Sequence, residues 1–183
     1  MPKLETRAIN TDLTASDDET RTVSGTAVVF NRDSEDLGGF IEQVDPHAFD
    51  TVDLRDVFML FNHDYDSVLC RTIANTLELT LDDAGLHFKA SLPDTSIGRD
   101  TYENVRNGNI QGCSFGFTVN EDKWDTSSTV YRRDILKIGE LYEITLTPIP
   151  AYRDTDVSVA QRFIKQKTSD LDKLKAELEL MTI

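Results

Sequence analysis

The sequence predicts a mainly β domain, a barrel or a sandwich with helices at its margins. Many short stretches of alternating or continuous apolar residues are separated by turn residues, which is the pattern of β-strands. One internal segment, residues 95–107, has the helical period instead. The chain has 183 residues, enough for one domain with a full core and an appendage.

Each strand is predicted from its own apolar run and from the turn signals on either side. Strands are expected in residues 20–31, 40–44, 57–61, 67–73, 77–81, 86–92, 114–120, 130–138 and 141–148. Residues 1–19 are polar and are expected to form a first strand and an exposed hairpin. Residues 82–85 are predicted to be a tight hairpin turn, and residues 121–129 a longer hairpin loop.

Two helix starts are predicted from capping signals. Asp45 at the N-cap and Pro46 at the first helical position favour a helix that begins there. The helix at residues 95–107 has Asp94 or Thr95 before it as a cap and Gly108 after it as a stop.

The last part of the chain differs from the rest. From residue 161 the strand pattern ends and apolar residues follow a heptad spacing, at Ile164, Leu171, Leu174, Leu178 and Met181. We therefore expect a β domain over residues 1–160 and an amphipathic helical tail over residues 161–183. Fewer than three heptads favour docking on a partner or on this domain over a free-standing coiled coil.

The net charge of −14 separates classes of partner. Such a surface repels nucleic acid and anionic membrane, so neither is expected as a partner. A basic protein partner fits the charge, although solubility alone also explains it. The N-terminus lacks the apolar region of a secretory signal, and no apolar run reaches the roughly 20 residues of a membrane span. The sequence therefore predicts a soluble cytoplasmic protein.

A hydroxyl and a thiol stand side by side between two glycines in residues 112–116. Glycine flanks let backbone approach closely, as a nucleophile beside an oxyanion pocket requires. The same flanks also suit a plain β-bulge or a tight barrel corner. Ser114 and Cys113 are both candidate nucleophiles, but strand neighbours face opposite sides, so only one can face a given base.

His63 and Glu143 are the candidate base and its orienting group. His63 follows an all-apolar strand, where sheet proteins place functional side chains, although a structural histidine is the common alternative. Glu143 is a charge within an apolar strand; alternation could point it at water, but if it faces inward it must be paired. An inward Glu143 bonded to His63 would hold the tautomer that accepts the Ser114 proton.

A metal site is the alternative use of the same histidine. Asp64, next to His63, permits a metal-dependent phosphohydrolase, but that chemistry needs further ligands, and His47 and His87 sit in no matching motif. Cys70 and Cys113 lie far apart without the CxxC spacing of zinc or redox sites. Reduced thiols are therefore expected.

Six blocks between residues 20 and 160 carry a family resemblance. They are residues 25–31, 42–49, 60–64, 86–90, 108–117 and 140–151. The second contains Val-Asp-Pro-His-Ala-Phe and the last contains Glu-Ile-Thr-Leu-Thr-Pro-Ile-Pro-Ala. In this order, with a histidine, a serine and a glutamate in place, they resemble the prohead (capsid-maturation) serine proteases of tailed bacteriophages, which are relatives in fold of the herpesvirus assemblins.

The resemblance implies a closed antiparallel β-barrel with surrounding helices. It also implies Ser114 as nucleophile, His63 as general base and Glu143 as the group that orients the histidine, with no metal or organic cofactor. Cys113 has no part in that mechanism beyond packing. For the oxyanion we expect backbone N–H groups near Tyr152 and Arg153, which follow the last strand.

The function implied is that of a serine endopeptidase inside the assembling prohead, in the cytoplasm of the bacterial host. Its substrates would be the scaffolding segment of the major capsid protein, or a separate scaffold protein, and the protease itself, with a homodimer left open. One alternative is a catalytically inactive capsid scaffold or assembly protein of the same fold. Another is a cysteine peptidase that uses Cys113.

Overall fold

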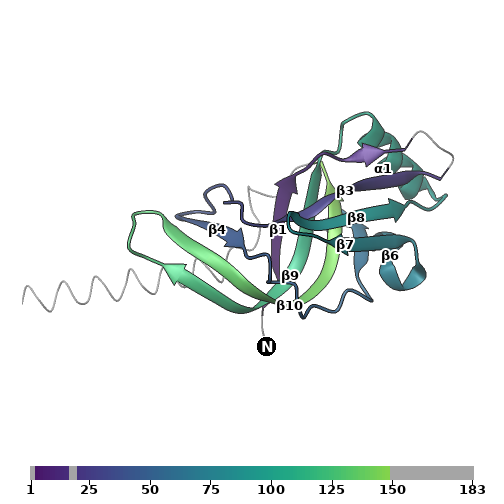
Figure 1. Ribbon diagram of the computed structural model, residues 1–183. Coiled ribbons are helices and arrows are strands. Elements are labelled where there is room, and N and C mark those ends of the chain that lie inside the picture. Colours follow the sequence, from purple (N-terminus) through teal and green to yellow (C-terminus); the bar gives the residue numbers. More distant parts are fainter. Residues whose placement is uncertain (1–2, 17–19, 149–183) are drawn as a thin grey trace, which may run out of the picture.

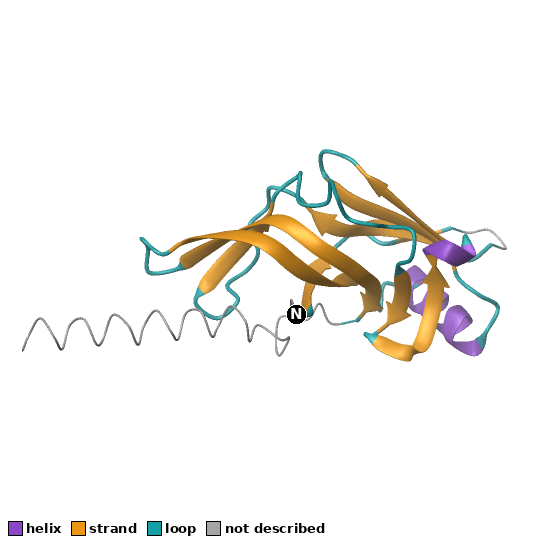
Figure 2. Ribbon diagram, turned by 90° about the horizontal axis from the view of Figure 1, so that it is seen from below, coloured by secondary structure: helices purple, strands orange, loops and turns teal. Residues whose placement is uncertain are grey.

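β-Strands dominate the computed structural model, which describes residues 3–16 and 20–148 (Figures 1 and 2). The strands are β1 (Glu5–Asn10), β2 (Thr14–Ala15), β3 (Thr22–Val29), β4 (Phe40–Val44), β5 (Phe58–Phe61), β6 (Asp64–Arg71), β7 (Leu77–Leu81), β8 (Gly85–Ser91), β9 (Gly112–Asp125) and β10 (Tyr131–Thr147). A short 3₁₀-helix, η1 (Thr72–Ala74), and one α-helix, α1 (Ser96–Arg106), accompany them. The mainly β prediction is confirmed.

The larger sheet is built on the long antiparallel hairpin of β9 and β10, which runs through the centre of Figure 1. Its strand order is β1-β9-β10-β5-β6, and β4 also pairs with β10. Both β4 and β5 run parallel to β10, β4 beside its first residues and β5 beside its last. The sheet is therefore mixed, and the expected all-antiparallel pairing is wrong at these two strands.

The smaller sheet has the order β2-β3-β8-β7, and all its pairs are antiparallel. Apolar side chains from both sheets form one core, among them Val23 and Phe88 from the smaller sheet and Phe115 and Ile144 from the larger. The described strands form two open sheets, so the expected closed barrel is not found in them. Closure requires the end strands to pair with one another, and here the two sheets meet through side chains instead.

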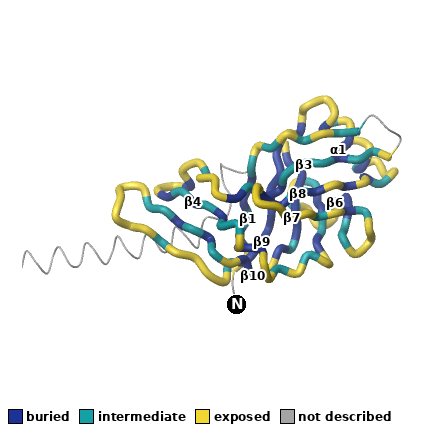
Figure 3. Tube along the Cα trace, in the orientation of Figure 1, coloured by how far each residue is buried: buried dark blue, intermediate teal, exposed yellow. Residues whose placement is uncertain are grey.

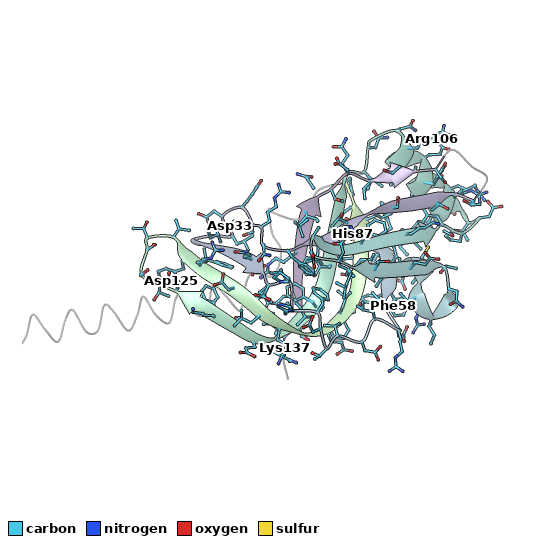
Figure 4. All side chains as sticks on the ribbon, viewed as in Figure 1. Asp33, Phe58, His87, Arg106, Asp125 and Lys137 are labelled. Atoms are coloured by element: carbon cyan, nitrogen blue, oxygen red, sulfur yellow. The ribbon has the colours of Figure 1, made fainter. Side chains whose placement is uncertain are left out.

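Helix α1 forms where the sequence predicts it. The Thr95 hydroxyl accepts a hydrogen bond from the Gly98 backbone N–H at 3.2 Å and so caps the first turn. Gly108, with a φ of +73°, lies just beyond the end of the helix, where a left-handed residue is needed. Figure 4 labels Arg106, the last residue of α1, and Asp125, at the tip of the β9–β10 hairpin, and the two lie toward opposite ends of the molecule.

The helix predicted to start at Asp45 is wrong, because this segment forms successive turns. Asp45 does cap the first turn, through the His47 backbone N–H at 2.8 Å. In a helix, the Ala48 carbonyl would accept from residue 52, but here it accepts from the Ile138 backbone N–H at 2.9 Å. The segment after β4 therefore runs along the edge of β10 toward β5 and cannot coil.

The strands predicted at residues 130–138 and 141–148 are one continuous strand, β10, which begins at Tyr131 and ends at Thr147. The loop before it is shorter than expected, residues 126–130, because β9 and β10 extend into a hairpin arm. The tip of that arm is exposed, whereas the first half of β9, residues 112–118, and most of the last part of β10, residues 141–147, are buried (Figure 3). Four register shifts in β10 interrupt its alternation, which is why the sequence pattern divides it in two.

A cluster of buried charges joins β1, β4 and β10. This ion-pair cluster consists of Glu5, Arg7, Glu42 and Arg133, whose side chains are 8% exposed or less. Glu5 accepts from Arg7 Nη2 and from Arg133 Nη1, both at 2.7 Å, and Glu42 accepts from Arg7 Nε. Arg133 also donates to Asp122 on β9 at 2.7 Å. Every charge in the cluster therefore faces an opposite one.

The predicted tail at residues 161–183 and the predicted oxyanion residues Tyr152 and Arg153 lie outside the described residues. Within residues 3–16 and 20–148, neither helix has the length and apolar character needed to cross a membrane.

Candidate functional site

Ser114 and Glu143 lie on one face of the larger sheet, which we call the site face. Residues paired across neighbouring strands point to the same side, so the register defines two rows on this face. The first row is Ala8, Ser114, Thr145 and Leu60, and the second is Thr6, Gly116, Glu143 and Phe58, the last of which is labelled in Figure 4. The intervening residues of β9 and β10, such as Phe115 and Ile144, point into the core.

A β-bulge places Glu143 on this face. Leu141 packs in the core and pairs with Phe117, and strict alternation would put Glu143 on the same side as Leu141. The register shifts between Leu141 and Glu143, so that Glu143 pairs with Gly116 and Ile144 takes the next core position. Bulges of this kind re-aim a side chain, and here the side chain that turns away from the core is the only acid in the last third of β10.

His63 reaches the site from a tight turn. Asn62 and His63 connect β5 to β6, and both have positive φ, 53° and 60°. Two such residues are typical of a type I′ hairpin, and asparagine and histidine tolerate this conformation better than most residues with a side chain. The polar end of the apolar strand is therefore a sharp corner that carries the imidazole beside β10.

His63 and Glu143 are hydrogen-bonded, as expected for an inward-facing Glu143. His63 Nδ1 lies 2.9 Å from Glu143 Oε1, and Glu143 is 3% exposed. A carboxylate oxygen accepts, so Nδ1 is the donor in this contact, and in a neutral imidazole Nε2 is then the acceptor. Nε2 is buried and has no hydrogen-bond partner among the described residues. The second carboxylate oxygen, Oε2, accepts from the Thr145 hydroxyl.

Ser114 lies on the same face but is bonded elsewhere. Its side chain is fully buried, and its hydroxyl donates to the Arg7 backbone carbonyl of β1 at 2.7 Å. Ser114 is paired directly with Thr145, so their Cβ atoms are about 5 Å apart. Between residues 3 and 148, as far as they are described, no hydrogen bond joins Ser114 to His63. The structure thus brings the predicted base and its orienting acid into contact and places the predicted nucleophile in the adjacent row.

Gly116 makes room for the acid. A Cβ on Gly116 would lie 2.6 Å from Glu143 Oε1 and 3.3 Å from Glu143 Cδ, closer than side chains approach. The carboxyl group therefore lies across β9 at this position. The sequence marks the glycine, but it suggests close approach of backbone, whereas the group that approaches is a side chain.

Both cysteines are buried away from the site face. Cys113 points into the core with an exposure of 0%, and burial, together with the charge of Glu143, raises the pKa of its thiol. Burial likewise raises the pKa of Cys70 to about 12. A thiol kept protonated in an apolar core is a poor nucleophile, so the burial of Cys113 disfavours the cysteine-peptidase alternative.

The other two histidines have structural partners. His87 lies 3.0 Å from both Thr26 Oγ1 and Asp82 Oδ1, and His47 lies 3.2 Å from Asp50 Oδ2. In the part of the chain that the structure describes, no group of three or more His, Cys, Asp or Glu side chains is arranged to hold a metal ion.

A cavity of about 140 Å³ opens near Arg7 and Val44, between β1, β3 and β4, and its lining includes Phe115 of the core face.

Two residues of the site carry no distinct sequence signal. Thr145 sits in an alternating strand, where threonine is common, and only its register beside Glu143 reveals its contact. Tyr65 follows the His63 turn and packs edge-on against Phe58, with ring centroids 5.9 Å apart. Partial burial raises the pKa of Tyr65, and the negative charge of Glu143 raises it further.

Comparison with known proteins gives one family match and two individual similarities. The sequence model of the family described as Caudovirus prohead serine protease matches residues 3–170. The prohead protease of Escherichia phage T5 is 24% identical over 108 residues, which are 59% of this chain and 48% of the phage T5 protein. The chain thus spans about half the length of that curated relative. The bacteriophage T4 capsid assembly protease has a similar fold, with a TM-score of 0.52 and 10% identity over 80% of this chain and 98% of the solved one.

Proposed function

Because the chain belongs to the Caudovirus prohead serine protease family, we propose that it is a serine endopeptidase with Ser114 as its nucleophile. The observation that carries this is the contact of His63 with a buried carboxylate. Glu143 fixes the proton on Nδ1, so that Nε2, which is buried and has no partner among the described residues, keeps a free lone pair. A histidine prepared in this way is what an alcohol needs in order to lose its proton.

The reaction starts when the Ser114 hydroxyl turns from the Arg7 carbonyl to His63 Nε2. Oγ then attacks the scissile carbonyl carbon, and its proton passes to Nε2. Glu143 stabilises the imidazolium that forms. When the tetrahedral intermediate collapses, the leaving amine takes the proton from Nε2 and the acyl group stays on Ser114. Water then attacks the acyl carbon and gives its proton to Nε2, and Ser114 Oγ leaves with that proton, so that the acid is released. Backbone N–H groups near Tyr152 and Arg153 are proposed to hold the oxyanion.

The proposed substrates are the scaffolding segment of the major capsid protein, or a separate scaffold protein, and the protease itself. Family membership and the fold shared with a capsid assembly protease support this substrate class. We place the reaction inside the assembling prohead, in the cytoplasm of the bacterial host. The acidic surface, with a net charge of −14, is consistent with a protein partner rather than nucleic acid.

A catalytically inactive assembly protein of the same fold is the second candidate. One observation favours it: the Ser114 hydroxyl is fully buried and already bonded to the Arg7 carbonyl. A hydroxyl that stays in this contact has no route to His63.

The test is co-expression of the full chain with its cognate capsid protein, followed by an intact-mass time course. Ser114→Ala is expected to lower the rate of processing by on the order of 10³-fold or more. Cys113→Ala is the matched control, since the neighbouring side chain faces the core, and it should process the capsid protein at the wild-type rate. Unchanged processing by Ser114→Ala would exclude the assignment, and absence of processing by the wild-type chain would favour the inactive assembly protein.

A further inference from the structure

Thr145 occupies the position between the proposed nucleophile and its acid. It lies on β10, directly across from Ser114 and two residues after Glu143, on the same face as both. Its side chain is fully buried, and its hydroxyl donates to Glu143 Oε2. The hydroxyl is thus the donor for the carboxylate oxygen that His63 does not use.

The two oxygens of Glu143 are therefore held by different donors. His63 Nδ1 holds Oε1, Thr145 holds Oε2, and the absent Cβ of Gly116 leaves the space in which the group lies. A carboxylate held at one oxygen alone can rotate about its last bond and change the direction in which it accepts. Held at both, it has one orientation, and His63 has one ring position.

We propose that Thr145 is a positioning residue that fixes the Glu143 carboxylate so that Oε1 faces His63 Nδ1. This inference rests on the proposed peptidase function, and it assigns to Thr145 no contact with substrate. The hydroxyl acts through Glu143 on His63, and it preserves the Nδ1–Oε1 contact that orients the ring. Loss of the hydroxyl leaves Oε2 buried without that donor, which favours rotation of the carboxylate toward other partners.

A purely structural threonine would behave differently. Removal of its hydroxyl would lower stability and leave the turnover of folded molecules unchanged. A positioning residue lowers kcat with little change in KM, because the ground-state contacts with the capsid protein are the same. It also alters the Nδ1 proton of His63, which can be followed as a downfield resonance in proton NMR spectra of ¹⁵N-labelled protein.

The experiment compares Thr145→Val, which keeps the shape, with Thr145→Ser, which keeps the hydroxyl. Thr145→Val is expected to lower kcat by on the order of 10- to 100-fold, the effect of one hydrogen bond to a charged group. The His63 Nδ1 resonance should broaden or disappear in this variant. Thr145→Ser is expected to stay within about threefold of wild type and to keep the resonance. Thr118→Val is the matched control: Thr118 is a threonine of β9, 3% exposed, in register with Glu140.

Each outcome decides the inference. A Thr145→Val chain that folds, cleaves within threefold of wild type and keeps the His63 resonance overturns it. If Thr145→Val does not fold, the pair Thr145→Ala and Thr145→Ser carries the test, since both lack the methyl group and only one lacks the hydroxyl; equal activity of the two overturns the inference. Ser114→Ala is measured in parallel. If it still cleaves, the proposed function fails; if it does not, and Thr145→Val does, only the role of Thr145 fails.

Discussion

The larger sheet has buried carboxylates in two places, the ion-pair cluster and the site face, and their hydrogen-bond donors differ in kind. In the ion-pair cluster, Glu5 and Glu42 face the guanidinium groups of Arg7 and Arg133. On the site face, the carboxylate of Glu143 has an imidazole and a hydroxyl as its hydrogen-bond donors. Strand β10 contributes to both, with Arg133 in the cluster and Glu143 on the site face.

The difference separates a polar group that holds the fold from one that is free to take part in the proposed chemistry. Arginine stays protonated at any ordinary pH, so the cluster has a single charge state and all its partners are satisfied. The imidazole of His63, in contrast, has one ring nitrogen, Nε2, that is buried and has no partner in the described part of the chain. The unsatisfied acceptor beside a buried acid therefore distinguishes the candidate functional group from the fully compensated ion-pair cluster.

The largest expected effect comes from changing the acid of the site while its shape is kept. Glu143→Gln should lower the rate of capsid-protein cleavage by about 10³- to 10⁴-fold, because an amide does not fix the tautomer of His63 or stabilise its cation. Cleavage rates by intact mass measure this, with Glu140→Gln as the control on an exposed position of the same strand. Equal rates for wild type and Glu143→Gln would remove the distinction between the two groups.

Removal of a charge from the ion-pair cluster should lower the free energy of unfolding and leave the rate of cleavage unaltered. Arg133→Met leaves Glu5 and Glu42 with one guanidinium fewer and should lower the free energy of unfolding by about 3–5 kcal/mol. Lys137→Met is the control from β10: its ion pair with Glu121 is 3.9 Å long and half exposed, and its removal should cost less than about 1 kcal/mol. Urea unfolding gives both values. An Arg133→Met chain as stable as wild type, or folded but inactive, would contradict this division.

The smallest effect concerns acid pH. Burial alone would raise the pKa of Glu5, but hydrogen bonds and charges from Arg133 and Arg7 outweigh it and lower that pKa from 4.5. A lowered folded-state pKa contributes stability above pH 4.5 that is lost as the pH falls through the folded value. The stability difference between wild type and Glu5→Gln should therefore be largest at neutral pH and shrink as the pH falls below 4.5. A difference independent of pH would show that Glu5 is not held by the arginines.

Most elements of the fold follow from local pattern, and the errors lie where distant segments meet. The cap at Thr95 and the stop at Gly108 fix α1, because both act within one turn of chain. The helix expected at Asp45 fails because the Ala48 carbonyl is taken by Ile138, ninety residues later. The closed barrel that the resemblance implied is not found in the described strands, and the pattern of the sequence could not decide the matter, because alternation shows that a segment is a strand but not which strand pairs with it.

The sequence singles out the side chains of the candidate site but not their geometry. His63 and Glu143 stand out as polar residues in apolar strands, and their contact was expected. The bulge that turns Glu143 away from the core, and the hydroxyl of Thr145 that holds it, have no sequence signature, because both depend on the register of β9 against β10. The contact of Ser114 with the Arg7 carbonyl depends in the same way on the pairing of β1.

The most direct test of the central claim, that Glu143 and His63 make Ser114 a nucleophile, is labelling with a serine-directed fluorophosphonate and location of the adduct by peptide mass mapping. We predict an adduct on Ser114 in the wild-type chain and a rate of labelling about 100-fold lower, or lower still, in Glu143→Gln. An adduct on another residue, or equal labelling of Ser114 in the two chains, would contradict it.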